Sequence, residues 1–247
     1  MADRPLIFSA PMVRALLDGR KCQTRRILKP QPIGFPWFWE GDEVDPVPGW
    51  FDGYEVGRTP CGAPEREVNV PLKGMPYAVG DRLWCREAWR LDSMNDDTSP
   101  ADFVRGLAEQ GMSGPNGLVR FEADERDAWG DEYTLPVGRL RPSIHLPRQL
   151  SRLALVVTEV RIQRVQEISE ADARAEGIFE RGSVGDSMAH STWTWQRTGW
   201  RYDTPRDAYK ALWTEIHGPG AWQRNDWVAA LTFTVHRANI ADVPEAA

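Results

Sequence analysis

The clearest pattern of apolar and polar positions lies between residues 153 and 162, where apolar side chains alternate with others. The alternation holds through Val157, slips by one residue, and resumes at Val160. A period of two is typical of a strand with one buried face, and a single slip indicates a β-bulge. We therefore predict a bulged strand over residues 153–162.

Two other segments carry strand patterns. Residues 83–85 are apolar and follow a Val-Gly-Asp turn at 79–81, and residues 227–235 place Trp, Ala, Leu, Phe and Val at every second position. Turn residues before a short apolar run, and strict alternation, both favour strands. The sequence thus predicts three strands that are far apart along the chain.

Short helices are predicted over residues 11–18, 169–176 and 205–217. Each follows a Ser or Thr that can cap the first turn, and a glycine follows each last turn. Short helices among distant strands, without regular βαβ alternation, indicate an α+β fold. We expect its sheet to be mainly antiparallel and barrel-like.

Three polar or Gly/Pro-rich stretches separate these periodic blocks, at residues 31–75, 92–138 and 179–203. The first contains an aromatic cluster, which favours an ordered surface excursion, because aromatic side chains rarely stay in water. The second is rich in Asp, Glu and Gly, which predicts an insertion with weak structure of its own. We interpret residues 1–247 as a single domain with large loop insertions.

Composition restricts the class of protein. The 247 residues carry 30 Lys+Arg and 36 Asp+Glu, a formal charge of -6 that argues against coating duplex nucleic acid. A local basic pocket stays compatible with this charge. No basic leader with an apolar run and no membrane-length apolar stretch occurs, so we expect a cytoplasmic protein without membrane contact. The three cysteines and four histidines are widely spaced, so we expect no metal and no cofactor.

The segment 19–26 reads Gly-Arg-Lys-Cys-Gln-Thr-Arg-Arg and directly follows the first predicted helix. We interpret it as a basic loop in which Lys21 precedes Thr24 by three residues. A lysine whose pKa is lowered by burial or by cationic neighbours can take the proton of a hydroxyl, which an always-protonated arginine cannot do. A solvated surface loop is the other interpretation of this spacing. The cationic neighbours are Arg20, Arg25 and Arg26.

Glu176 is placed against its local preference. It occupies the last turn of a predicted helix, where a negative charge opposes the helix dipole. Either a basic partner such as Lys21 holds it there, or the position has no special meaning.

Three motifs occur in the order found in one known family. They are the GxKxxTxR pattern at 19–26, a strand opened by Gly-Asp at 80–83, and a Ser-Glu-x-x-Ala-x-x-Glu stretch at 169–176. On these motifs, which span about half of the chain, the sequence resembles the ASCH domain family of the PUA-like superfamily.

This resemblance implies a PUA-like fold, a small β-barrel with packed helices and a cleft for a nucleobase or nucleotide. One activity known in the family is the hydrolysis of N(4)-acetylcytidine to cytidine and acetate. The catalytic lysine, threonine and glutamate of that activity fall on Lys21, Thr24 and Glu176. Other members are described as ribonucleases or RNA-binding proteins.

The resulting hypothesis is an amidohydrolase for acylated cytosine nucleosides or nucleotides. Thr24 attacks the amide carbonyl, Lys21 takes the hydroxyl proton and returns it to the leaving amine, and Glu176 either orients Lys21 or shuttles the proton. We expect the substrate to be bound by neighbouring cationic and aromatic side chains, while its acyl group and the oligomeric state stay open. The expected substrate-binding residues are Arg20, Arg25, Arg26 and Trp84, with Trp37 and Trp39 as weaker stacking candidates.

Two other functions use the same residues. In a module that binds RNA or a modified base without turnover, Lys21 and Arg26 would bind phosphate. In a metal-independent ribonuclease acting on single-stranded RNA, Lys21 would work with Tyr77 or His145. The position of His145 between two prolines favours packing or a backbone hydrogen bond over catalysis.

Overall fold

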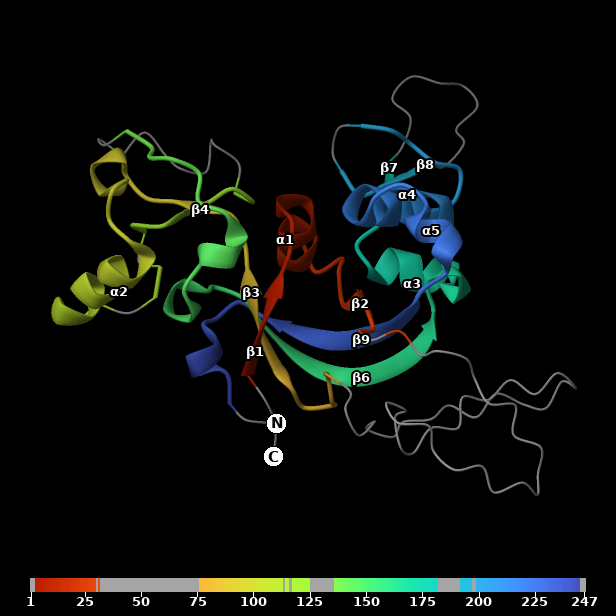
Figure 1. Ribbon diagram of the computed structural model, residues 1–247, viewed down its shortest axis with the longest axis horizontal. Helices are drawn as coiled ribbons and strands as arrows, with labels where there is room; N and C mark the ends of the chain where they lie inside the picture. The colour runs from red at the N-terminus through yellow and green to blue at the C-terminus, as the bar shows by residue number, and fades with distance from the viewer. Residues whose placement is uncertain are drawn as a thin grey trace, which may run out of the picture.

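The computed structural model describes most of the chain and places most of its helices over one curved sheet (Figure 1). The described residues are 3–29, 31, 76–112, 114–115, 117–124, 136–181, 192–196 and 199–244. The strands are β1 (Asp3–Ile7), β2 (Gln23–Ile27), β3 (Arg82–Arg86), β4 (Trp89–Arg90), β5 (Arg120–Phe121), β6 (Ala154–Arg164), β7 (Phe179–Arg181), β8 (Thr192–Thr194) and β9 (Trp227–His236). The α-helices are α1 (Ala10–Leu17), α2 (Pro100–Glu109), α3 (Glu170–Ala175), α4 (Pro205–His217) and α5 (Ala221–Arg224). Short 3-10 turns are η1 (Ser93–Asn95), η3 (Ser143–His145), η4 (Arg148–Leu150), η5 (Val165–Glu167) and η6 (Ile240–Asp242).

The central sheet has five strands in the order β1-β3-β6-β9-β2. All neighbouring pairs are antiparallel except β1 and β3, which run parallel. The expectation of an α+β fold with a mainly antiparallel sheet is therefore confirmed. Within the described residues the sheet stays open, with β1 and β2 at its edges, so the closed barrel expected from the resemblance is not seen.

The two long strands β6 and β9 form the middle of the sheet. Their register shifts between Val157 and Glu159, at the place where the apolar alternation of the sequence slips. The predicted bulge is thus confirmed, and the bulge adds to the local twist that bends the sheet around the helices. In β9 the five residues from Trp227 are all buried, which is typical of a strand covered on both faces.

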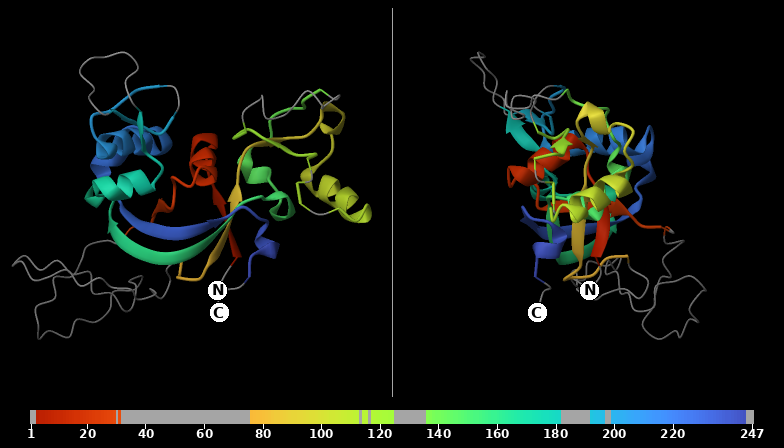
Figure 2. Two further views of the ribbon diagram at one scale, coloured as in Figure 1. Left: turned by 180° about the vertical axis from the view of Figure 1, so that it is seen from behind. Right: turned by 90° about the vertical axis from the view of Figure 1, so that its left-hand side faces the viewer.

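Helices α1, α3 and α4 lie where the capping signals predict them. Ser169 accepts a hydrogen bond from the backbone N–H of Asp172, and Thr204 accepts one from Asp207, so both act as N-caps. Figures 1 and 2 show α3, α4 and α5 gathered over one end of the sheet, with α1 beside them. Their apolar faces and the strands beneath share the largest hydrophobic core.

Two expectations about the polar segments are wrong. Residues 23–27 form strand β2 instead of continuing a loop, because their backbone pairs with β9 from Gln23 to Ile27. The 92–138 stretch contains helix α2 and strand β5, and its apolar residues pack with those of flanking segments in a hydrophobic core separate from the main one. The core residues of this second cluster are Trp89, Leu91, Leu107, Val119, Phe121, Leu146 and Leu150.

The other two stretches are only partly described. Strands β7 and β8 form a hairpin within the 179–203 stretch, whereas nearly all of the 31–75 stretch, including Trp37 and Trp39, lies outside the described residues. No helix in the described part of the chain has the length and apolar character that crossing a membrane requires.

Candidate active site

Lys21 and Glu176 meet inside the protein, although 155 residues separate them in sequence. After α1 ends, Gly19 turns the chain with φ of 72°, and the backbone N–H of Lys21 donates to the carbonyl of Ala15. Lys21 and Glu176 then pair as an isolated antiparallel bridge at the end of α3. This backbone pairing brings both side chains to the same buried point.

Two hydrogen bonds join the side-chain nitrogen of Lys21 to Glu176. The lysine Nζ donates to the carboxylate Oε2 at 2.7 Å and to the Glu176 backbone carbonyl at 2.8 Å. Lys21 is 2% exposed and Glu176 is 3% exposed, so the pair is closed off from solvent. The sequence hypothesis that a basic partner such as Lys21 holds Glu176 in place agrees with this geometry.

Burial lowers the pKa of Lys21 because it disfavours the charged ammonium. The charge and hydrogen bond of Glu176 act in the opposite direction, and the positive charges of Arg26 and Arg25 lower the pKa further. The net shift is downward, which is the direction that a lysine needs to act as a base.

Arg25 connects the pair to a second carboxylate. Its Nη1 donates to Glu176 Oε1 at 3.0 Å and to Gln23 Oε1 at 2.8 Å, and its Nη2 lies 3.0 Å from Asp172 Oδ2. The Arg25 side chain is fully buried. Its expected role in binding substrate does not fit this placement, because its guanidinium already holds the two carboxylates.

Asp172 is shared between two arginines. Besides its contact with Arg25, its Oδ1 accepts a hydrogen bond from Arg161 at 2.9 Å. Burial raises the pKa of Asp172, but the Arg161 hydrogen bond and the charges of both arginines outweigh burial and lower it. Asp172 is therefore ionised at neutral pH, and it anchors the Arg25 guanidinium beside Glu176.

Aromatic rings cover the buried cations. The Phe8 ring centroid lies 5.8 Å from the Nζ of Lys21 and 5.1 Å from the guanidinium carbon of Arg26. Tyr209 from α4 is buried, and burial followed by the charge of Glu176 raises its pKa well above the ordinary value. Tyr209 is therefore a neutral phenol beside the carboxylate.

Thr24 lies on β2, paired in register with Leu231 of β9, and is 4% exposed. In the part of the chain that the structure describes, no hydrogen bond joins its hydroxyl to Lys21 or Glu176. The structure therefore brings Lys21 and Glu176, two of the three predicted catalytic residues, into contact. Thr24, the third, follows Lys21 by three residues and makes no hydrogen bond to either within the described residues.

The other predicted binding residues lie in different surroundings. Arg26 is half-buried and donates from Nη2 to the carbonyl of Ile7 at 2.9 Å. Arg20 lies outside the buried pair, with its Nη1 donating to the carbonyl of Gly177 at 3.0 Å. Trp84 is 6% exposed in a separate cluster with Ala154, Ile240 and Val243, so we leave it out of the proposed site.

The two residues of the ribonuclease alternative lie in different surroundings. Tyr77 packs against the main core, whereas His145 is exposed in η3, where its backbone N–H donates to Pro142. His145 thus makes the backbone hydrogen bond that its position between prolines favours. No structural contact links it to Lys21 among the described residues.

Sequence reasoning missed Tyr209 and the inward orientation of Arg25. Tyr209 carries no motif, since it looks like any apolar-face residue of α4. The structure shows no group of three or more metal-binding side chains among the described residues. No family model, no curated protein and no solved structure matches the chain.

We predict that a glycine is required at position 177, because the backbone there lies close to Ala15 of α1 and to Lys21. The φ of Gly177 is 102°, and a Cβ there would lie 2.9 Å from the Cβ of Ala15 and 3.5 Å from that of Lys21. Gly177→Ala should lower the free energy of unfolding by about 2 kcal/mol, through backbone strain and overpacking. Urea denaturation measures this change.

The matched control for that substitution is Gly106→Ala in α2, where an added Cβ meets no atom within 4 Å. A helical Gly→Ala change should raise the free energy of unfolding by about 0.5–1 kcal/mol. Equal effects of the two substitutions would contradict the close approach at Gly177.

Proposed function

We propose that the protein is an amidohydrolase acting on acylated cytosine nucleosides or nucleotides, with Lys21 as its base and Glu176 as the group that orients Lys21. The observation that carries the proposal is the buried contact of 2.7 Å between these two side chains. The two residues come from separate motifs of the ASCH-like pattern, and a shared site would explain why both motifs are present.

The hydrogen bonds of Lys21 suit a neutral amine. A neutral lysine has two N–H donors and one lone pair, and the carboxylate and carbonyl of Glu176 accept two N–H groups. The lone pair is then free to take a proton. Glu176 thus orients the amine without using the electron pair that a base needs.

Charge balance also favours the neutral form. Arg25 neutralises Glu176 at the carboxylate oxygen that Lys21 does not contact, so the carboxylate keeps a cationic partner when Lys21 loses its proton. Removing two opposite charges from water is costly unless they stay paired. The Arg25 contact therefore lowers the cost of deprotonating Lys21.

In the proposed reaction the hydroxyl oxygen of Thr24 attacks the acyl carbonyl carbon while Lys21 takes the hydroxyl proton. Collapse of the tetrahedral intermediate breaks the C–N bond, and Lys21 returns the proton to the departing amine of cytosine. Water then attacks the Thr24 ester while Lys21 takes a proton from the water. The C–O bond to Thr24 breaks, Lys21 returns the proton to the Thr24 oxygen, and the acid is released. Because Lys21 and Thr24 are both closed off from solvent, a neighbouring segment has to move when substrate enters.

We further propose that the open sheet is a PUA-like barrel whose edges come together at Arg26. This residue of β2 donates to the carbonyl of Ile7 in β1, so a side chain links the two edge strands. This contact supports a barrel in which side chains, in place of backbone hydrogen bonds, join the edge strands β1 and β2.

The test is to incubate the purified protein with N(4)-acetylcytidine and to follow cytidine and acetate by chromatography. We expect turnover that persists in EDTA and that rises with pH through a single inflection below 10.5, the ordinary pKa of lysine. The rise has this sign because only deprotonated Lys21 is a base.

Thr24→Ala should abolish turnover, whereas Thr24→Ser, which keeps a hydroxyl, should retain part of it. Undiminished cleavage by Thr24→Ala would remove the nucleophile from the proposal. An absence of turnover on all acylated cytidines and cytidine nucleotides would leave the buried lysine and glutamate as a structural ion pair.

A further inference from the structure

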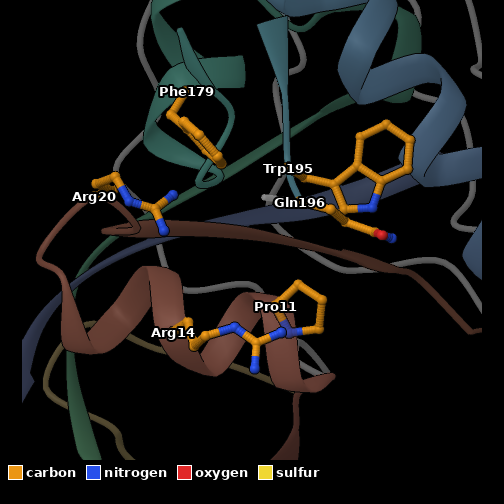
Figure 3. Close-up of a pocket in the computed structure, with 6 residues that line it drawn as sticks. All are labelled: Pro11, Arg14, Arg20, Phe179, Trp195 and Gln196. Atoms are coloured by element: carbon orange, nitrogen blue, oxygen red, sulfur yellow. The ribbon is translucent and has the colours of Figure 1, made fainter. Parts of the chain in front are cut away.

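A second cluster of arginine and aromatic side chains surrounds a small surface pocket next to the Lys21–Glu176 bridge. Figure 3 shows Pro11 and Arg14 from α1 on one side, Phe179 and Trp195 on the other, and Arg20 reaching in between them. The lining residues are Pro11, Arg14, Arg20, Phe179, Trp195 and Gln196.

The pocket and the buried pair lie next to each other, because adjacent residues of two backbone segments belong to each. Arg20 immediately precedes Lys21, and its Nη1 donates to the carbonyl of Gly177, which immediately follows Glu176. A group bound by the Arg20 side chain therefore lies just outside the bridge that holds Lys21 and Glu176 together.

The two arginines keep donors free for a ligand. Arg14 donates once, from Nη1 to the carbonyl of Ala123 at 3.0 Å, and no carboxylate lies within ion-pair distance of it in the described part of the chain. Arg20 donates to Asp18 and Gly177 and keeps further N–H groups of its five. The pocket thus has an unbalanced positive charge from Arg14.

The neighbouring side chains orient Arg20 and add a polar group. The Arg20 guanidinium lies 4.6 Å from the centroid of the Phe179 ring, a cation–π contact that orients its plane. Trp195 is held by stacking on Tyr202, with ring centroids 5.8 Å apart. The Gln196 side-chain amide has no hydrogen bond within the described residues, and the lining includes no Asp or Glu.

We propose that this pocket binds the phosphate group of a nucleotide. Guanidinium groups match phosphate oxygens in geometry and charge, and the aromatic rings provide walls for the attached nucleoside. The inference rests on the proposed function and narrows its substrate class, because it makes the natural substrate a phosphorylated cytosine derivative instead of a free nucleoside.

Isothermal titration calorimetry with cytidine monophosphate and cytidine tests this pocket without any turnover. We expect the monophosphate to bind about tenfold or more tightly than cytidine, and Arg14→Gln to remove about tenfold of that affinity. The matched control is Arg105→Gln, an exposed arginine on α2 that should leave binding unchanged. Equal affinity for the two ligands, or unchanged binding by Arg14→Gln, overturns the proposal.

Two further titrations identify the source of the phosphate. Inorganic phosphate should compete with the monophosphate, and failure to compete counts against phosphate recognition. A pentacytidylate that binds more tightly than the monophosphate, with the same dependence on Arg14, supports the pocket and assigns its phosphate to single-stranded RNA.

The failure of this inference can be told from the failure of the proposed function. Arg14-dependent binding without any hydrolysis of acylated cytidines would refute the amidohydrolase and keep the pocket. Hydrolysis of acylated cytidines together with binding that does not depend on Arg14 would refute the phosphate pocket and keep the amidohydrolase.

Discussion

Lys21→Met is expected to lower kcat for N(4)-acetylcytidine about a thousandfold, which is the scale of a general base. Methionine has a similar length and no titratable group, so the substitution removes the amine and nearly preserves the volume. Glu176 keeps its hydrogen bond from Arg25 in this variant, so the carboxylate is not left without a cation. Steady-state kinetics at a pH on the plateau of the wild-type profile measures the loss.

Lys210→Met is the matched control, because Lys210 is an exposed lysine on α4. It should leave kcat unchanged. The Lys21→Met variant should also lose the pH dependence that we assign to the lysine, a result that a merely structural role would not produce. Turnover by Lys21→Met within a few fold of wild type would show that Lys21 is not the base.

Much of this fold can be predicted from local signals in the sequence. The slip in apolar alternation predicts the β-bulge of β6, and the Ser and Thr caps predict the starts of α3 and α4, because each signal depends on residues close together in the chain. Glu176 was also recognisable, since an acid at a helix end calls for a partner.

Strand β2 could not be predicted from such signals. Its inward side chains include Gln23 and Arg25. Arg25 is buried because it pairs with the carboxylates of Asp172 and Glu176, and Gln23 accepts a hydrogen bond from Arg25. Hydrophobic alternation is absent from a strand of this kind, so the segment looks like a polar loop. The burial depends on Asp172 and Glu176, which lie about 150 residues further along.

The second core was missed for a related reason. Asp, Glu and Gly dominate the composition of residues 92–138, yet Leu107 and Phe121 pack with Trp89, Leu91 and Leu146 from the flanking segments. Composition within one stretch cannot show that its few apolar residues have partners outside it. Trp84 is the opposite case, an aromatic expected at the site that fills a small core instead.

These observations give the Arg25 network a clear role in the proposed site. In this network the partly exposed Asp172 holds Arg25, and the buried Arg25 holds Glu176. A chain of ion pairs fixes the position of the carboxylate, and the carboxylate then fixes the amine of Lys21. The same chain makes Glu176 the residue whose loss should affect stability most.

Glu176→Gln is expected to lower the free energy of unfolding by about 3–5 kcal/mol, because it removes the carboxylate that pairs with both Lys21 and Arg25, so that the buried lysine must give up its proton when the chain folds. For a chain of this size the melting temperature should fall by roughly 10 °C. Glu109→Gln, an exposed glutamate at the end of α2, is the matched control and should change stability little. Thermal and urea unfolding measure both variants.

The pH dependence of the Glu176→Gln variant checks the cause. Without the carboxylate, the pKa of Lys21 in the folded state falls further below its unfolded value, so the unfolded state binds more protons and stability rises with pH toward 10.5. The double variant Lys21→Met/Glu176→Gln has no lysine to deprotonate on folding and should be more stable than Glu176→Gln alone, with this rise removed. A double variant no more stable than Glu176→Gln would show that Lys21 is not the charge that Glu176 neutralises.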